Sequence, residues 1–100
     1  MLMEFDWDPD KASSNRAKHG VRFEDAMTVF LDPLALSILD EAHGRAEERW
    51  VTLGRSAPGR LLLVVHTYIE LIDDRIAIRI ISARPATRRE ARQYEEGIDG

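Results

Sequence analysis

The stretch RIAIRIISARPATRREARQY, residues 75–94, places a strand pattern, a proline and a helix pattern in one short segment. Isoleucines recur from Ile76 to Ile81 at the spacing of a buried β-strand. Pro85 interrupts this pattern, so we expect the strand to end near Ala83. Thr87 and Glu90 have the spacing of a capping box, which predicts a helix from about residue 87 to Glu96, closed by Gly97.

The residues before and after this stretch predict a single α+β domain over residues 1–100. Asp8 and Pro9 are typical of a helix start, and Gly20 of a helix end. Short turns join most predicted strands, which favours an antiparallel sheet with the first two helices on one face. The predicted order is β-α-α-β-β-β-β-α: strands over 3–7, 34–39, 47–55, 60–69 and 75–83, helices over 9–19, 23–31 and 87–96, and a polar loop over 40–46.

Composition excludes several classes of protein. The chain has no cysteine, which rules out disulfides and thiolate metal sites. No signal peptide and no apolar run long enough to span a bilayer are recognisable, so we expect a cytoplasmic protein that does not enter membranes. The three histidines lack zinc-ligand spacing, and adjacent Asp73 and Asp74 are more typical of a solvated turn than of a metal pair. We therefore expect neither metal nor cofactor.

Charge is unevenly distributed. Residues 75–94 hold six arginines and one glutamate, a local charge of +5, whereas the whole chain carries −4. Such a cluster on an acidic protein favours a localised phosphate site over general adhesion to nucleic acid. Arg79 is the most unusual member because it interrupts an apolar strand, where a guanidinium needs an acid or a bound anion. A salt-bridge network with Glu47 or Glu48 is an equally good interpretation from the sequence.

Other candidate residues also have two interpretations. His66, in LLLVVHT, is either a hydrogen-bonded core histidine, the more frequent case, or a general acid or base. His19 is more typical of a cation at a helix end than of a catalyst. Glu48 is either a proton carrier or a solvated residue. Trp7 and Trp50 are more typical of core or interface aromatics than of platforms for RNA bases.

Four segments together resemble the BrnT toxins of bacterial type II toxin–antitoxin systems. They are FDWDPDKASSNRAKHGVRFEDAMTVFLDPLAL, EERWVTLGRS, LLVVHT and RIISARPATRREARQYEEG, in that order along nearly the whole chain. The resemblance implies a RelE-like fold and a small ribonuclease that halts translation by cutting RNA. It also implies a BrnA-type antitoxin as partner, operator DNA contacted only through that antitoxin, and a homodimer within the assembly.

From the resemblance and the charge pattern together, we expect metal-independent cleavage in which the ribose 2′-OH attacks the adjacent phosphate. Arg79 and Arg84 are expected to hold the phosphate, and His66 or Glu48 to move the proton. The substrate-binding residues implied are Lys18, His19, Arg49, Arg55, Ser82 and Arg88. The alternatives are a partner-binding module without catalysis, and a structural role in which Arg79 to Arg92 only pair with Glu90, Glu95 and Glu96 along the helix.

Overall fold

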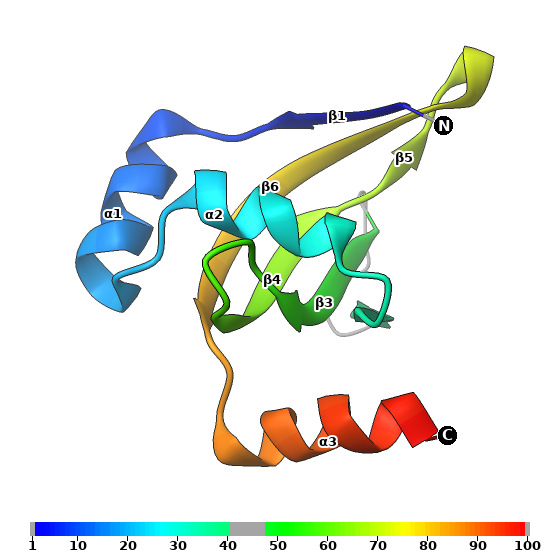
Figure 1. Cartoon of the computed structure of the whole chain (residues 1–100). Coiled ribbons are helices and arrows are strands. Elements are labelled where there is room, and N and C mark those ends of the chain that lie inside the picture. The colour runs from blue at the N-terminus through cyan, green and yellow to red at the C-terminus, as the bar shows by residue number, and fades with distance from the viewer. Residues whose placement is uncertain (1, 41–47, 100) are drawn as a thin grey trace.

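The computed structural model describes residues 2–40 and 48–99 and shows an α+β protein (Figure 1). Within these two ranges the chain forms three α-helices, two 3-10 turns and six strands. The elements are β1 (Leu2–Asp6), α1 (Pro9–His19), α2 (Phe23–Met27), η1 (Thr28–Leu31), β2 (Leu36–Asp40), β3 (Arg49–Arg55), β4 (Leu61–Thr67), β5 (Ile69–Glu70), η3 (Ile72–Asp74), β6 (Arg75–Pro85) and α3 (Arg88–Asp99). The start and end of α1 follow the predicted signals: Asp8 caps the helix, and Gly20 ends it with φ +68°.

The strands form one mixed sheet in the order β1-β6-β4-β3-β2, with β5 also pairing with β6. The pairs β2–β3, β3–β4 and β4–β6 are antiparallel, as expected for strands joined by short connections. The expectation of an entirely antiparallel sheet is wrong for β1, which runs parallel to β6. This difference arises because β1 and β6 lie at opposite ends of the chain, so no tight turn dictates their relative direction.

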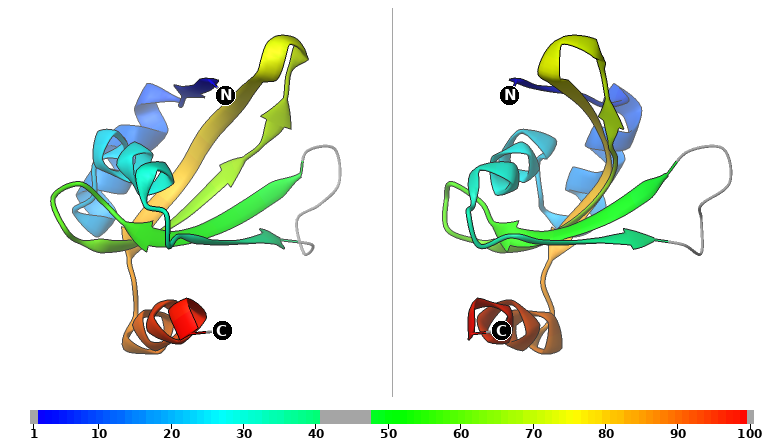
Figure 2. Two further views of the ribbon diagram at one scale, coloured as in Figure 1. Left: turned by 45° about the vertical axis from the view of Figure 1, so that its right-hand side comes forward. Right: turned by 90° about the vertical axis from the view of Figure 1, so that its right-hand side faces the viewer.

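Helices occupy both sides of the sheet (Figure 2). We call the face that carries α2 and η1 the inner face, and the face nearer α3 the outer face. The predicted apolar stripe of the second helix is confirmed, since Phe23 and Ala26 are fully buried and Phe30 packs beside them. The buried apolar core consists of Val21, Phe23, Ala26, Val29, Leu62, Val64, Ile76, Ile78, Ile80 and Ala83.

Several predicted boundaries differ from the structure. The second helix changes to 3-10 geometry after Met27, and the strand predicted over 60–69 divides into β4 and β5. β6 continues through Pro85, because the next N–H, that of Ala86, donates to the Leu61 carbonyl at 2.9 Å and extends the ladder. α3 continues past Gly97. Residues 41–47 of the predicted loop and strand start, Glu47 included, lie outside the described residues.

Asn15 attaches α1 to β6 where β1 has ended. Its Oδ1 accepts from the Ala83 N–H at 3.0 Å, and its Nδ2 donates to the Ala83 carbonyl at 2.8 Å. Nδ2 also donates to the Val21 carbonyl at 3.1 Å. The amide therefore replaces a neighbouring strand, satisfying backbone groups that would otherwise be buried without partners.

Replacing Asn15 with alanine is expected to lower the free energy of unfolding by about 1–3 kcal/mol, since buried backbone groups lose their partners. Urea unfolding of both proteins measures the change. Ser13→Ala, at an exposed position on the same helix, is the control and should leave the midpoint unchanged. Equal midpoints for Asn15→Ala and wild type would contradict the assigned role.

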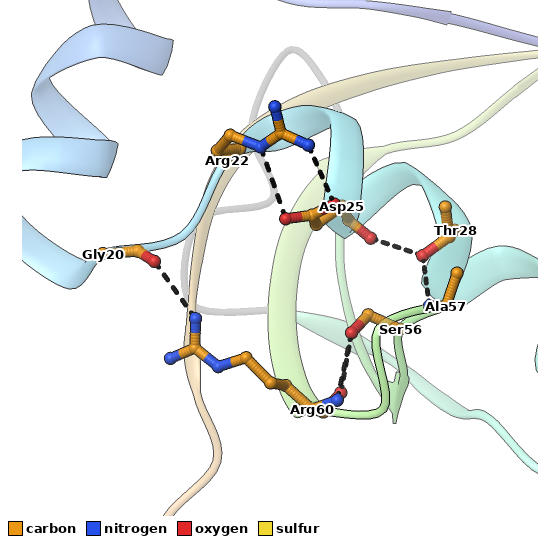
Figure 3. A network of polar contacts seen from close by, with 7 residues as sticks. All are labelled: Gly20, Arg22, Asp25, Thr28, Ser56, Ala57 and Arg60. Carbon is orange, nitrogen blue, oxygen red and sulfur yellow. Dashed lines mark hydrogen bonds and ion pairs between the residues drawn. The ribbon is translucent and has the colours of Figure 1, made fainter.

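A polar network joins the turn between β3 and β4 to the segment between α1 and α2 (Figure 3). The Arg60 guanidinium donates to the Gly20 carbonyl at 3.1 Å, and the Ala57 N–H donates to Thr28 Oγ1 at 2.8 Å. Thr28 in turn donates to the Asp25 carbonyl at 2.6 Å. These contacts fix the end of α1 relative to the sheet.

Asp32 anchors α3 to the rest of the fold. Its Oδ2 accepts from the Tyr94 hydroxyl at 2.7 Å and from the Arg55 N–H at 2.8 Å. Burial raises the pKa of Asp32, but hydrogen bonds from Arg55, Tyr94 and Leu34 outweigh it and the net pKa is lowered. The hydrogen bond between Tyr94 and Asp32 raises the pKa of Tyr94. The carboxylate thus keeps its charge while it holds the helix.

Candidate functional site

A surface hollow of about 320 Å³ lies between α1 and the second half of β6. It brings together Lys18, His19 and Ser82, three of the residues expected to bind substrate. Its full lining is Asp10, Lys11, Ser14, Asn15, Lys18, His19, Ile81 and Ser82. The volume is at the lower end of the range for small-molecule sites. Two lysines against one aspartate give the hollow the positive character that a phosphate requires.

Local structure explains how these side chains meet. Lys18 and His19 occupy the last turn of α1, which Gly20 ends in a left-handed conformation. The pairing of β4 with β6 shifts register between Val65 and His66, which pair with Ser82 and Ile80 respectively. This bulge lies beside Ile81 and directs the strand past α1. Asn15 fixes the distance between helix and strand, so the hollow depends on both elements.

Arg79 lies elsewhere, on the outer face of β6, where it pairs with Asp6 of β1. The Nη1–Oδ2 distance is 3.0 Å, and the two side chains are 50% and 68% exposed. Asp6 stands directly opposite Arg79 in the parallel register. From the sequence we expected Glu47 or Glu48 as the salt-bridge partner of Arg79. We did not expect Asp6, because the sequence does not reveal that β1 pairs with β6. An ion pair so exposed contributes about 0–1 kcal/mol, so an anion can replace Asp6 at little cost.

Arg84 is held more firmly, by two hydrogen bonds of 2.8 Å to the two carboxylate oxygens of Glu90. Glu90 also accepts from the Thr87 N–H at 2.9 Å, which confirms the predicted capping box. The hydrogen bonds from Arg84 lower the pKa of Glu90 to about 2. The interpretation of this arginine as a partner of Glu90 within the fold is therefore confirmed.

The Arg84–Glu90 pair predicts a specific dependence of stability on pH. The folded pKa of Glu90 lies below its ordinary 4.5, so the stabilisation is complete above about pH 4.5 and is lost as pH falls toward 2. Glu90→Gln should therefore be less stable than wild type at pH 6, with the difference shrinking below pH 4.5. Urea unfolding at pH values from 6 to below 4.5 measures this difference in stability, and Glu95→Gln, at an exposed position, is the control. A constant difference at all pH values would refute the assignment.

His66 is buried, with 2% of its surface exposed, and both ring nitrogens have partners inside the fold. Nδ1 lies 2.8 Å from the Thr67 carbonyl, and Nε2 lies 2.7 Å from Thr52 Oγ1. Burial lowers the pKa of His66, which keeps the ring neutral. The interpretation as a hydrogen-bonded core histidine is confirmed, and the geometry gives the ring no free nitrogen with which to move a substrate proton.

The remaining candidates occupy other parts of the surface. Arg55 donates to the Gly59 carbonyl at 2.9 Å and lies over the Tyr94 ring, 5.6 Å from its centre. Glu48 is exposed immediately before β3, Arg49 is the first residue of that strand, and Arg88 is exposed at the start of α3. Trp7 packs edge-on against Phe23 at 5.9 Å, which confirms its interpretation as a core aromatic.

Arg79 and Arg84 therefore do not converge on one hollow. They are five residues apart on one strand, roughly 16 Å along its axis, and each pairs with its own acid. Five residues that line the hollow beside α1 were not expected from the sequence, and two of them, Lys11 and Ser14, have exposed side chains that can donate to a phosphate. The helical spacing of Lys11, Ser14 and Lys18 could have indicated them, because residues three, four or seven apart share a face.

Metal ligands and membrane spans are also absent from the part of the chain that the structure describes. No group of three or more histidine, aspartate or glutamate side chains is placed to hold a metal ion among residues 2–40 and 48–99. No helix within these ranges is long and apolar enough to cross a bilayer.

The mixed sheet, with Lys18, His19 and Ser82 in one hollow beside its longest strand, defines a small α+β protein. The profile of the family described as the ribonuclease toxin, BrnT, of type II toxin–antitoxin systems matches residues 7–90. The chain belongs to this family, and the expected resemblance is confirmed.

The same relationship is visible among solved structures. The 1.1 Å crystal structure of the Brucella abortus ribonuclease toxin, BrnT, matches with a TM-score of 0.57 and 24% sequence identity. The match covers 88% of this chain and 100% of that one. At this identity the likeness concerns the fold. No curated protein sequence matches the chain.

Proposed function

We propose that this protein is a metal-independent endoribonuclease that cuts RNA and thereby inhibits translation. The proposal rests on membership of a family of ribonuclease toxins together with one observation: Lys18, His19 and Ser82 line a single positively charged hollow. Ammonium and hydroxyl groups are suitable donors for a phosphodiester, and a histidine beside them can carry a proton.

In the proposed reaction, the ribose 2′-oxygen forms a bond to the adjacent phosphorus and the bond from phosphorus to the 5′-oxygen breaks. The products are a 2′,3′-cyclic phosphate and a free 5′-hydroxyl. Lys18 and the Ser82 hydroxyl stabilise the charge that develops on the phosphoryl oxygens. His19 accepts the 2′-OH proton and delivers it to the leaving 5′-oxygen, so that the proton balance is closed. Glu48, which does not line the hollow, remains the alternative proton carrier.

Arg79 and Arg84 have different parts in this proposal. Arg79 gives up its exposed pair with Asp6 and contacts a neighbouring phosphate of the RNA, since that pair is weak. Arg84, two residues after Ser82 on the same strand, stays with Glu90 and holds the start of α3 in position. Arg49, Arg55 and Arg88 remain candidates for contacts further along the RNA.

The proposed biology follows the family. A BrnA-type antitoxin neutralises the toxin and carries the operator-DNA contacts, and the toxin forms a homodimer within that assembly. The fold is related to RelE-like toxins, and the protein acts in the cytoplasm. The absence of a spanning helix among the described residues is compatible with this location.

Purified protein incubated with RNA tests the proposal. Cleavage should persist in EDTA and leave 2′,3′-cyclic phosphate ends. Cleavage that stops on chelation and returns with added divalent metal would refute the metal-independent mechanism. Intact RNA under all conditions would refute the enzymatic function.

A partner-binding module without catalysis is the second candidate function. The observation that favours it is that Arg79 and Arg84 already pair with Asp6 and Glu90. Expression of the chain without its antitoxin distinguishes the two. Growth arrest with cut RNA supports the enzyme, whereas normal growth with intact RNA supports the module.

A further inference from the structure

A second cavity, of about 480 Å³, opens on the inner face of the sheet, away from the hollow beside α1. Its walls come from η1 and all six strands, and they are mainly apolar and aromatic. The lining residues are Met3, Phe30, Ser37, Trp50, His66, Tyr68, Glu70, Ile76 and Ile78. In Figures 1 and 2 the β5–β6 hairpin, which lies at one end of this cavity, extends away from α2 and η1.

The hydrogen bonds behind the cavity wall have a fixed direction. The Thr67 carbonyl can only accept, so His66 Nδ1 carries the proton and donates to it. His66 Nε2 must therefore accept, and Thr52 donates to it at 2.7 Å. Thr52 has then used its proton, so the Ser37 hydroxyl donates to Thr52 at 2.8 Å. Ser37 consequently offers only lone pairs to a ligand in the cavity.

Glu70 provides the charge of the cavity. Its side chain is exposed, and within the described residues no ion pair neutralises it. The neighbouring cation is Arg75, which precedes Ile76, the residue that Glu70 pairs with across the strands, but Arg75 is paired with Glu4 at 2.8 Å. His66 is neutral, so among the described residues of the lining Glu70 is the one that carries a charge. Trp50 and Tyr68 stand beside each other, with ring centres 6.0 Å apart. Aromatic faces with a carboxylate and an accepting hydroxyl are complementary to a cation that carries N–H donors.

We propose that this cavity receives an arginine or lysine side chain of a protein partner, namely the antitoxin. This inference rests on the proposed toxin–antitoxin function. The carboxylate disfavours RNA, whose phosphates it would repel. Exposed apolar residues adjoin the lining and favour a protein surface: Leu39 pairs with Trp50 across the strands, and Ile72 follows Glu70 by two residues.

Calorimetry with the purified antitoxin encoded with this chain tests the proposal. Glu70→Gln should raise the Kd by about thirtyfold or more, because it removes one member of a charge pair that binding buries. Glu95→Gln, which removes the same charge from exposed α3, should bind like wild type. An unchanged Kd for Glu70→Gln overturns the proposal, and so does an equal loss in both variants.

Substitutions on the partner locate the cation. Each arginine and lysine of the antitoxin is replaced with methionine and measured against wild-type toxin and Glu70→Gln. One position should lose affinity with wild type but not with Glu70→Gln, the signature of a direct pair. If every position loses equally with both toxins, the assignment to a basic side chain is wrong.

RNA cleavage in the absence of antitoxin separates this inference from the proposed function. Glu70→Gln should cut RNA as wild type does. Reduced cleavage with unchanged antitoxin binding would assign the cavity to RNA and overturn the inference alone. Glu70-dependent antitoxin binding by a chain that never cuts RNA would support the inference and refute the proposed enzyme.

Discussion

Replacing Lys18 with methionine should lower the rate of RNA cleavage by about a hundredfold while leaving the fold intact. The reason is that the ammonium group lines the hollow beside His19 and Ser82, where fixed positive charge acts on the transition state. Lys18 is exposed, so its loss creates no buried cavity. Single-turnover cleavage of a labelled RNA gives the rate, and thermal unfolding checks the fold.

The control for Lys18→Met is Arg89→Met, which removes one positive charge from an exposed position on α3. It should cleave RNA within about twofold of wild type, since general charge attraction is weak at physiological salt. Equal losses in both variants would mean that total charge, and not the hollow, controls cleavage. A Lys18→Met protein as active as wild type would remove this hollow from the mechanism.

Replacing Phe23 with alanine should lower the free energy of unfolding by about 3–5 kcal/mol, the usual cost of truncating a buried phenylalanine. Phe23 has no exposed surface and packs between Trp7 and the central strands. Since small domains are stable by about 5–15 kcal/mol, the variant should be close to unfolding at 37 °C. Urea denaturation followed by tryptophan fluorescence measures the loss.

Ile72→Ala is the matched control for Phe23→Ala, because it removes apolar atoms from a side chain that is 83% exposed. Its unfolding midpoint should stay within experimental error of wild type. A small effect at Phe23 would show that the core closes around the missing ring. A large effect at Ile72 would show that this side chain is covered in solution, for example by a second copy of the chain.

Features encoded by nearby residues could be predicted from the sequence. Asp8, Pro9 and Gly20 set the limits of α1, and Thr87 with Glu90 sets the start of α3. Each signal depends on residues a few positions apart, whose hydrogen bonds form wherever the rest of the chain lies. Lys18 and His19 were placed correctly at a helix end for the same reason.

Features that depend on distant pairings could not be predicted. The parallel contact of β1 with β6 decides that Arg79 meets Asp6, and no local pattern specifies that contact. The bulge beside Ile81 and the Asn15 amide bring Ser82 to α1, although these residues are far apart in sequence. The arginine cluster indicated a phosphate site, but sequence proximity on one strand did not bring its side chains to one place.

The central position of β6 also affects when the protein can fold during its synthesis. β6 pairs with β1, β4 and β5, and it contacts α1 and α2, yet among the described residues it is the last strand in the sequence. A nascent chain that lacks residues 75–85 has no surface on which β1 and α1 can dock. An incomplete product that stops before β6 therefore leaves β1 and β4 without the strand that both of them pair with.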